Sequence, residues 1–253
     1  MTHSLTVSAA DALRMMTISG LTKHYGGVPA LQGVDLTLGR GRVTAILGPN
    51  GAGKTTLIKT ILGLTRADSG AMLLDGRQLG GDPALRAGIG YMPQIARFPE
   101  NLTGAELMAM LVDLRGATAL LDRALVERFR LGTELTKPLR TLSGGTRQKV
   151  NAVLAFLFAP ELLILDEPTA GLDPIASSVL KDKILEERTV GKTFVLTSHI
   201  MSELEELADD VVFLLDGTVR FAGSLHELKF RTRQLSLERA VAQLMREGEG
   251  EAA

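Results

Sequence analysis

Residues 48–56 read Gly48-Pro49-Asn50-Gly51-Ala52-Gly53-Lys54-Thr55-Thr56, and they stand between an apolar run and a helix-like segment. Glycines let successive backbone N–H groups turn toward one point, where they can hold phosphate oxygens. Residues 43–47 read as a buried strand and residues 54–62 as a helix, whose N-terminus adds positive charge. A glycine-rich turn without a ligand is the alternative, but this strand and helix favour a phosphate-binding loop.

A second stretch, Leu162-Leu163-Ile164-Leu165-Asp166-Glu167, supplies carboxylates. A carboxylate at the end of an apolar strand is costly to bury unless a cation offsets its charge, so Asp166 is predicted to bind Mg²⁺. Glu167 then lies where it can polarise an attacking water. The alternative is that both residues only end the strand, but the phosphate-binding loop upstream favours the site. There, Lys54 would reach the β- and γ-phosphates and the Thr55 hydroxyl would bind Mg²⁺.

Composition limits the class of protein. The chain has 253 residues, a formal net charge of -1 and no cysteine. The balanced charge gives no field that favours nucleic acid, and the lack of cysteine excludes disulfides and thiolate metal sites. No apolar run is long enough to span a bilayer, and the first residues lack the features of a secretory signal. We therefore expect a cytoplasmic protein that needs a partner to act across a membrane.

Hydrophobic periodicity divides the chain into a tail at residues 1–15, a folded region at 16–224 and a charged helical tail at 225–253. Apolar positions recur at helical spacing in residues 97–141, which predicts a small helical subdomain inserted into an α/β core. The expected strands are 16–19, 34–38, 43–47, 71–75, 89–92, 162–166 and 193–197, with a terminal hairpin of 211–215 and 218–222. The expected helices are 54–62, 105–114, 120–129, 145–158, 201–208 and one that starts at Pro174.

Between the two halves of the nucleotide site stands Leu142-Ser143-Gly144-Gly145-Thr146-Arg147-Gln148-Lys149. With the other motifs in this order, residues 16–224 resemble the ATP-binding cassette (ABC) family, whose members close as dimers over ATP. The resemblance implies an α/β fold, with a P-loop NTPase (ABC ATPase) core, an N-terminal antiparallel β subdomain and the inserted helical subdomain.

The resemblance also assigns roles that single residues would not support. It implies that Tyr25 stacks on adenine, that Gln94 contacts Mg²⁺ and water, and that His199 holds the γ-phosphate. The family's signature, here Ser143, Gly144 and Gly145, would meet ATP held by the other subunit. Asp173 would lie at the seam of the dimer. The expected ATP contacts are Tyr25, Gly48, Pro49, Asn50, Gly51, Ala52, Gly53, Lys54, Thr55, Thr56, Ser143, Gly144, Gly145 and Asp173. The expected Mg²⁺ ligands are Thr55, Gln94 and Asp166, and catalysis is assigned to Glu167, His199 and Gln94.

One residue departs from the family pattern: Thr146 stands where the signature commonly has glutamine. Because the γ-phosphate contacts come from Ser143 and backbone N–H groups in the family, we expect activity to survive. The change puts one contact in doubt, which is the hydrogen bond that the glutamine side chain would make across the dimer.

A finer resemblance is to the ABC ATPase subunits that serve nitrous-oxide reductase maturation in denitrifying bacteria. It is carried by the stretches Thr146-Arg147-Gln148-Lys149-Val150-Asn151-Ala152, Ala155-Phe156-Leu157-Phe158 and Glu167-Pro168-Thr169-Ala170-Gly171-Leu172-Asp173-Pro174. The implied role is to power copper-site assembly by moving a copper- or sulfur-related species.

The expected function is thus ATP hydrolysis by a homodimer that drives an integral membrane permease at the cytoplasmic face of the inner membrane, with a periplasmic accessory protein as a further partner. The alternatives are an ABC transporter ATPase for another cargo, a soluble ABC ATPase acting on ribosomes or DNA, and a P-loop small-molecule kinase. The single cassette and the lack of a basic patch disfavour the second, and the Leu-Ser-Gly-Gly segment disfavours the kinase.

Overall fold

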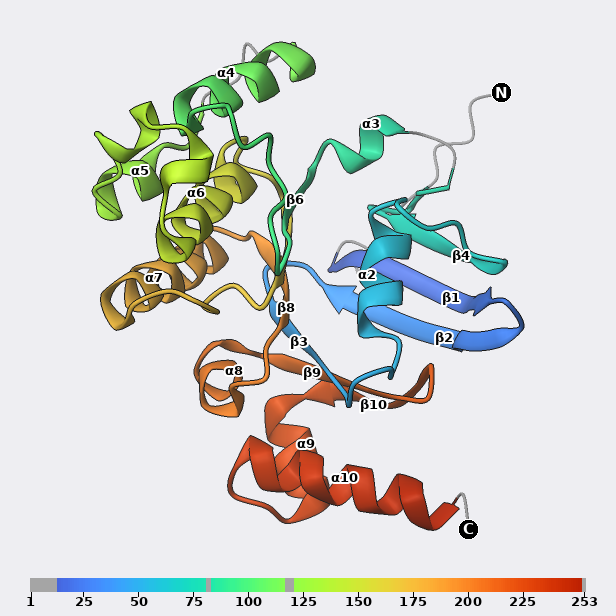
Figure 1. Ribbon diagram of the computed structural model, residues 1–253. Helices are drawn as coiled ribbons and strands as arrows, with labels where there is room; N and C mark the ends of the chain where they lie inside the picture. Colours follow the sequence, from blue (N-terminus) through green and yellow to red (C-terminus); the bar gives the residue numbers. More distant parts are fainter. Residues whose placement is uncertain (1–12, 81–82, 117–120, 252–253) are drawn as a thin grey trace. The chain divides into compact units, whose positions relative to one another are not determined.

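The computed structural model describes residues 13–80, 83–116 and 121–251, which form two compact units (Figure 1). The first unit contains the described residues up to Gly88 together with those from Ile200 onward, and the second is Ile89–His199. The second unit is larger than the predicted helical insertion at 97–141, because three strands and two long helices belong to the same unit as the insertion.

An antiparallel sheet forms one part of the first unit, as the family resemblance implies. Its strand order is β2-β1-β4-β5, and the strands are β1 (Arg14–Tyr25), β2 (Val28–Gly39), β4 (Ser69–Leu74) and β5 (Arg77–Gln78). β1 begins at Arg14 and both Met15 and Met16 are buried, so the predicted tail at 1–15 extends too far into the fold. The rest of that predicted tail, residues 1–12, lies outside the described residues.

The other strands of the first unit carry the phosphate-binding loop. β3 (Val43–Leu47) pairs in parallel with β9 (Asp210–Leu215), and β9 pairs antiparallel with β10 (Thr218–Ser224). All five side chains of β3 are buried, as the apolar run predicts. The β9–β10 turn at Asp216-Gly217 has φ values of +49° and +74°, the conformation of a tight hairpin. This unit also contains the helices α2 (Lys54–Ile61), α3 (Pro83–Arg86) and α8 (Met201–Leu207).

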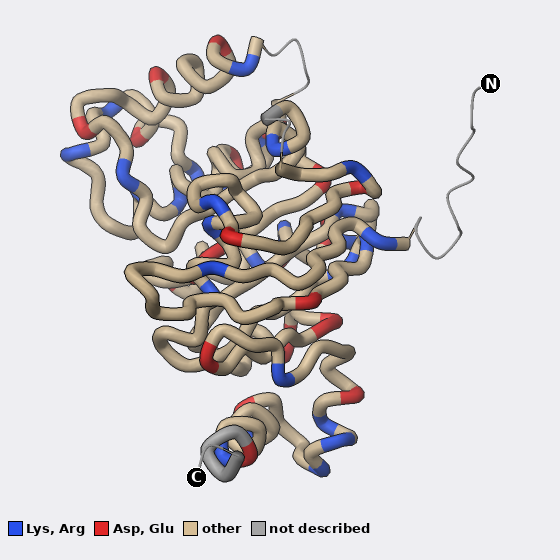
Figure 2. The backbone as a smooth tube through the Cα atoms, turned by 90° about the vertical axis from the view of Figure 1, so that its right-hand side faces the viewer, with Lys and Arg blue, Asp and Glu red and all other residues tan. Residues whose placement is uncertain are grey.

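The C-terminal region forms two helices, α9 (Leu225–Thr232) and α10 (Leu237–Glu251). α10 buries Leu237, Ala240, Val241 and Leu244, which recur at helical spacing, and it packs on α8 and α9. Basic and acidic residues both occur along this region, visible at the lower end of Figure 2. The predicted helical tail is therefore a packed part of the first unit.

The second unit is built on a parallel sheet with strand order β8-β7-β6, formed by β6 (Ile89–Met92), β7 (Leu162–Asp166) and β8 (Thr193–Thr197). Its long helices are α6 (Gly144–Phe156) and α7 (Pro174–Thr189). α6 approaches β6 closely, because a Cβ added at Gly90 would lie 2.5 Å from the Ala155 carbonyl oxygen. All three strands have the bounds that the sequence predicts.

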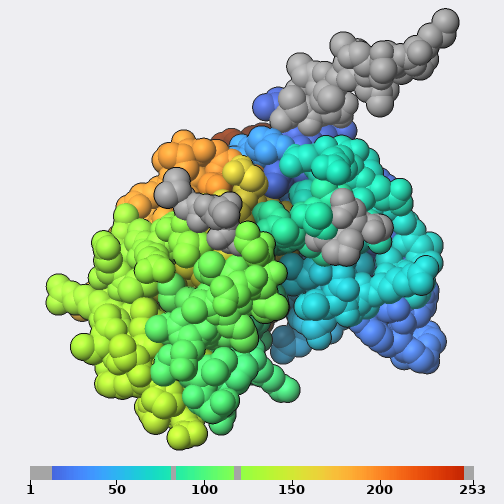
Figure 3. All heavy atoms as spheres, turned by 90° about the horizontal axis from the view of Figure 1, so that it is seen from above, coloured from blue at the N-terminus to red at the C-terminus, as the bar shows by residue number. Residues whose placement is uncertain are grey.

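The helical insertion contains α4 (Gly104–Arg115), α5 (Ala124–Arg128) and two short 3-10 turns, η1 (Glu134–Thr136) and η2 (Leu139–Thr141). A capping box between Thr103 and Glu106 starts α4. α5 is shorter than the helix predicted at 120–129, of which residue 120 lies outside the described residues. The difference lies mainly at its start, which is Ala124, and Arg130 beyond its end takes a left-handed conformation with φ +54°. Figure 3 shows α4 and the segment after it, in green and yellow-green, on one face of this unit.

A buried ion cluster ties the insertion to α7. The Lys183 ammonium donates to Asp122 and to Glu187, each at 2.6 Å. Burial alone would lower the pKa of Lys183, but these two carboxylates raise it above its ordinary value. The cluster fixes the start of the α5 region against α7 within the second unit.

Candidate nucleotide site

Two glycines of the phosphate-binding loop are required by close backbone approaches. Gly48 has φ +148°, and a Cβ there would lie 2.2 Å from the Leu214 carbonyl oxygen. Gly53 has φ +102°, and its Cβ would lie 2.5 Å from the Ala30 carbonyl oxygen. Both distances are shorter than real Cβ contacts, so the loop can take this shape only with glycine at these positions. The loop leads directly into α2, as the sequence predicts.

Lys54 folds back over this loop. Its Nζ donates to the carbonyl oxygens of Gly48 at 2.6 Å and of Pro49 at 3.0 Å. The ammonium is therefore held above the turn that the backbone makes, at the first residue of α2. A cation fixed there beside a helix N-terminus is suited to bind phosphate.

Tyr25 ends β1 and lies in the same unit as the loop. Its side chain is exposed, and the Lys23 Nζ lies 5.4 Å from its ring centroid. Its hydroxyl donates to the Thr65 Oγ1 at 3.4 Å. Asp68, beside it, receives hydrogen bonds from Lys23 and His24, which lower the pKa of that carboxyl to about 2. An exposed aromatic ring of this kind is available to stack on a base.

The second unit carries the carboxylates. Asp166 ends β7, and its Oδ1 accepts a hydrogen bond from the Thr197 Oγ1 at the end of β8. Burial, with a smaller contribution from the Asp166 charge, raises the pKa of Tyr91 on β6. Asp166 thus stands at the carboxyl end of a parallel sheet, where ligands of such sheets bind.

Glu167 and His199 contact each other at that same edge. The His199 backbone N–H donates to the Glu167 Oε2 at 3.3 Å, and the His199 Nε2 lies 3.4 Å from the Glu167 Oε1. The glutamate side chain is only 12% exposed, whereas the histidine side chain is 63% exposed. The structure therefore brings these two predicted catalytic residues together, with the carboxylate partly shielded from water.

Glu167 is also held in an uncommon backbone conformation. Its φ is +51°, in the left-handed region that non-glycine residues rarely occupy. Its N–H donates to the Thr197 carbonyl oxygen at 3.1 Å and to the Thr197 Oγ1 at 3.2 Å. Such strain persists only where the surroundings fix it, and it often marks functional sites.

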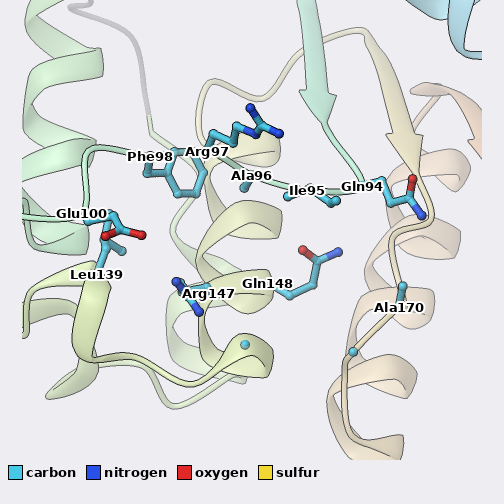
Figure 4. A pocket seen from close by; sticks show the side chains of 12 residues that line it. Gln94, Ile95, Ala96, Arg97, Phe98, Glu100, Leu139, Arg147, Gln148 and Ala170 are labelled. Carbon is cyan, nitrogen blue, oxygen red and sulfur yellow. The ribbon is translucent and has the colours of Figure 1, made fainter.

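Gln94 lies two residues after the end of β6 and is exposed. It lines a groove of about 660 Å³ with Arg97 and Glu100 from the same segment, Arg147 and Gln148 from α6, and Ala170 from the β7–α7 connection. Figure 4 shows residues 94–98 running above α6, with the Gln148 side chain directed toward them. The groove therefore lies between the segment that begins at Gln94 and the first turns of α6, the helix that starts with the signature glycines.

Ser143 caps the N-terminus of α6. Its Oγ accepts from the Thr146 backbone N–H at 3.1 Å and lies 2.8 Å from the Thr146 Oγ1. Thr146, the departure from the family pattern, therefore hydrogen-bonds to the signature serine. The sequence did not indicate this contact, although a serine N-cap bonding three residues ahead is a common helix start.

Gly144 and Gly145 begin the same helix, and Asp173 caps α7. A Cβ at Gly145 would lie 3.0 Å from the Gly171 carbonyl oxygen. The Asp173 Oδ1 accepts from the Ala176 N–H at 2.9 Å, and its Oδ2 pairs with the Lys149 Nζ at 2.9 Å. The Lys149 hydrogen bond is the main cause that lowers the pKa of Asp173. The Asp173 side chain thus already caps a helix and forms an ion pair.

The predicted site residues fall into two groups, one in each unit. Tyr25 and Gly48–Thr56 belong to the first unit, and Gln94, the signature, Asp166, Glu167, Asp173 and His199 belong to the second. Sequence reasoning missed Thr197, which bonds both Asp166 and Glu167. Its signal was a hydroxyl at the end of an apolar strand, two residues before His199.

Comparison with known proteins agrees with these motifs. A family model described as ABC transporter matches residues 31–170. A daunorubicin resistance ATP-binding protein, DrrA3, of Streptomyces coeruleorubidus is 36% identical over 222 residues, which cover 86% of this chain and 70% of that protein. A lantibiotic transport ATP-binding protein, SrtF, of Streptococcus pyogenes is 33% identical over 205 residues, which cover 81% of this chain and 89% of that protein.

A solved structure of the ATP-binding subunit of an ABC transporter superposes with a TM-score of 0.85 at 32% identity, over 91% of this chain and 99% of that one. The fold, the family model and the relatives agree. The chain therefore belongs to the ABC transporter family and is an ATP-binding subunit that hydrolyses ATP.

Proposed function

We propose that Glu167 is the residue that activates water for ATP hydrolysis, with His199 holding the γ-phosphate beside it. The observation that carries this proposal is their contact, 3.4 Å between the His199 Nε2 and the Glu167 Oε1, at the carboxyl ends of β7 and β8. Lys54 and the backbone of Gly48–Thr56 bind the phosphates, and Tyr25 stacks on adenine. Gln94, in the segment after β6, contacts Mg²⁺ and the attacking water and senses the membrane partner.

Thr55, Gln94 and Asp166 are the proposed Mg²⁺ ligands. They offer a hydroxyl, an amide and a carboxylate, and these oxygen donors are the kind that Mg²⁺ takes. The ion would neutralise phosphate charge as it builds up during hydrolysis. In this arrangement Thr197 orients the Asp166 carboxylate through its hydrogen bond to Oδ1.

Members of the ABC family act as dimers with membrane permease partners. We propose the same for this chain, with Ser143, Gly144 and Gly145 binding the ATP held by the other copy and with Asp173 at the seam between the copies. ATP then stabilises the closed dimer, because it binds that state better than the open one, and hydrolysis removes the preference.

Ser143→Arg should stop hydrolysis while the same subunit keeps its ATP affinity, because the serine serves the opposite subunit's γ-phosphate. Mixed with Lys54→Ala, it should form heterodimers with one intact composite site out of two. Nucleotide titration of Ser143→Arg and trapping of nucleotide in the mixture measure both effects. Heterodimers without any trapped nucleotide would show that the site does not form in trans.

The proposed docking surface for the permease is the segment from Gln94 to Arg115. A groove of about 230 Å³ lies along it, lined by Phe98, Leu111 and Arg115 together with Phe158 of the α6–β7 connection. The Arg115 guanidinium lies 4.0 Å from the Phe158 ring centroid. Phe98 and Leu102 in this segment are both half-buried, and Phe98 lines the groove. The exposed large apolar residues of this segment are Ile95, Met110 and Leu114.

Phe98→Asp should uncouple the subunit from its permease. The charge would lie in the apolar groove, so the isolated subunit should keep basal ATP hydrolysis and lose co-purification with the permease. Val190→Asp is the control, because Val190 is also apolar, is 73% exposed and lies outside the segment 94–115. Normal assembly of Phe98→Asp with the permease would exclude this surface, and loss of folded protein would mean that Phe98 belongs to the core.

None of the helices within residues 13–80, 83–116 and 121–251 is long and apolar enough to cross a membrane. From the resemblance to transporter ATPases, the proposed location is peripheral, on the cytoplasmic face of the inner membrane, where a separate permease supplies the membrane spans. A periplasmic accessory protein on the far side of that permease completes the proposed assembly.

The proposed cargo is a copper- or sulfur-related species used in nitrous-oxide reductase maturation. It is supported by the sequence stretches at 146–152, 155–158 and 167–174. A second candidate, export of an organic compound, is favoured by the relatives named for daunorubicin resistance and lantibiotic transport. Deletion of the gene in a host that makes nitrous-oxide reductase separates them: that enzyme should lack copper, and a fully copper-loaded enzyme would favour the export of another compound.

A further inference from the structure

Two amide side chains form a buried polar chain on the inner face of α6. Gln148 and Asn151 are three residues apart, so they lie on the same side of the helix. They are 8% and 2% exposed, respectively. Buried amides are costly unless they are hydrogen-bonded, so their partners indicate what the two residues do.

The hydrogen-bonded chain of these two amides runs between two backbone carbonyl groups. The Asn151 Nδ2 donates to the Pro93 carbonyl oxygen at 2.8 Å and to the Gln148 Oε1 at 3.2 Å. The Gln148 Nε2 donates in turn to the Pro168 carbonyl oxygen at 3.4 Å. Because a carbonyl oxygen only accepts, each end of the chain requires an amide NH₂ group. This orientation of the two side chains therefore satisfies both ends.

Both carbonyl groups belong to residues beside the proposed catalytic machinery. Pro93 directly precedes Gln94, and Pro168 directly follows Glu167. Proline has no N–H, so the carbonyl oxygen is the one backbone group through which each of these residues can be held by a hydrogen bond. Glu167 has φ +51° and therefore needs such restraint on both sides. Thr197 holds it on one side, through the Glu167 N–H, and Gln148 holds the residue after it.

We propose that Gln148 and Asn151 are positioning residues for ATP hydrolysis. They join the segment that begins at Gln94 and the backbone that follows Glu167 to the helix that starts at Ser143. A displacement of α6 is then transmitted to both segments together. The proposal rests on the proposed roles of Gln94 and Glu167 and adds two residues that do not touch the nucleotide.

Asn151→Ala and Gln148→Leu test this directly, because both remove the hydrogen bond between the two amides. Each also removes the bond at its own end, to Pro93 or to Pro168. In each variant kcat should fall roughly tenfold or more, since small misplacements of a reacting group are costly. KM for ATP and nucleotide affinity should stay within about twofold, because the phosphate-binding loop is unchanged. The double variant should be no slower than the slower single variant, because both changes break the same chain. Independent, multiplying losses of kcat would contradict a shared role.

Hydrogen exchange gives a readout that does not depend on turnover. Asn151→Ala should speed amide exchange in residues 94–98, and Gln148→Leu should speed it in residues 169–172. Unchanged exchange in both segments would overturn the proposal. If one of the two variants does not fold, the other makes the same test at its own end of the chain.

Val153→Ala is the matched control, because Val153 is a buried apolar residue on the same helix and has no part in the amide chain. It should lower Tm and leave kcat unchanged well below Tm. An equal loss of kcat in Val153→Ala at matched Tm would mean that general loosening of α6 explains the effect. Glu167→Gln separates this proposal from the proposed function. If Glu167→Gln is inactive while Asn151→Ala and Gln148→Leu turn over normally, only the positioning role is wrong.

Discussion

Glu167→Gln should reduce ATP turnover by roughly 10²- to 10⁴-fold, the range for loss of a general base. The amide cannot accept the proton of the attacking water. It keeps an oxygen that can accept from the His199 N–H, now 3.3 Å from the Glu167 Oε2, so the fold should be retained. ATP affinity should also be retained, and the variant should accumulate as an ATP-dependent dimer. Phosphate release and light scattering measure the two effects.

Glu161→Gln is the control for that experiment. Glu161 directly precedes β7, whereas Glu167 directly follows it, so the two glutamates lie at opposite ends of one strand. Glu161 is exposed and pairs with Lys192 at 3.1 Å. Its replacement should leave turnover unchanged. Wild-type hydrolysis by Glu167→Gln would remove the role that we assign to Glu167.

The sheet strands were the most predictable part of this fold. Residues 43–47, 89–92, 162–166 and 193–197 are short apolar runs with definite ends, and each is a strand with those bounds. A strand that is buried on both faces needs apolar residues at nearly every position, so the length of the apolar run predicts the length of the strand. The β1 strand was harder, because only part of it is buried: Arg14–Tyr25 is three times as long as the run predicted at 16–19.

The helices were less well defined at their ends. α5 was predicted at 120–129, but it spans only Ala124–Arg128, and no sequence pattern marks its start or the left-handed conformation of Arg130 beyond its end. The division into units was also not visible, because the second unit forms through contacts between segments far apart in the chain. The Lys183 cluster with Asp122 and Glu187 is one such contact.

The site motifs could be located from sequence, but their side-chain partners could not. Ser143 and Thr146 were both noted, yet the 2.8 Å contact between their hydroxyl oxygens depends on the first turn of α6. Asp173 was assigned to ATP from its motif, and the structure adds that its carboxylate caps α7 and pairs with Lys149. Spacing identifies the residues of a motif, and only the fold determines what each side chain contacts.

Lys54→Ala should act earlier than Glu167→Gln, at nucleotide binding. The ammonium supplies charge-assisted hydrogen bonds to the phosphates, and the loss of about 1.5–3 kcal/mol corresponds to a roughly ten- to hundred-fold weaker affinity. The structure adds a second reason, because the Lys54 Nζ also holds the carbonyl groups of Gly48 and Pro49 at 2.6 and 3.0 Å. Without nucleotide, the loop should therefore also lose order in this variant, and faster amide exchange in residues 48–53 would detect that loss.

Lys59→Ala is the matched control for Lys54→Ala, since Lys59 is an exposed lysine in the last turn of the same helix. It removes the same charge from the protein without touching the loop, so nucleotide titration should give the wild-type affinity. Equal weakening by both variants would mean that overall charge, and not the loop, determines binding. Unchanged affinity in Lys54→Ala would contradict the placement of the phosphates at Gly48–Thr56. Loss confined to Lys54→Ala locates binding at the N-terminus of α2, where the backbone, the helix dipole and the ammonium act on the same phosphates.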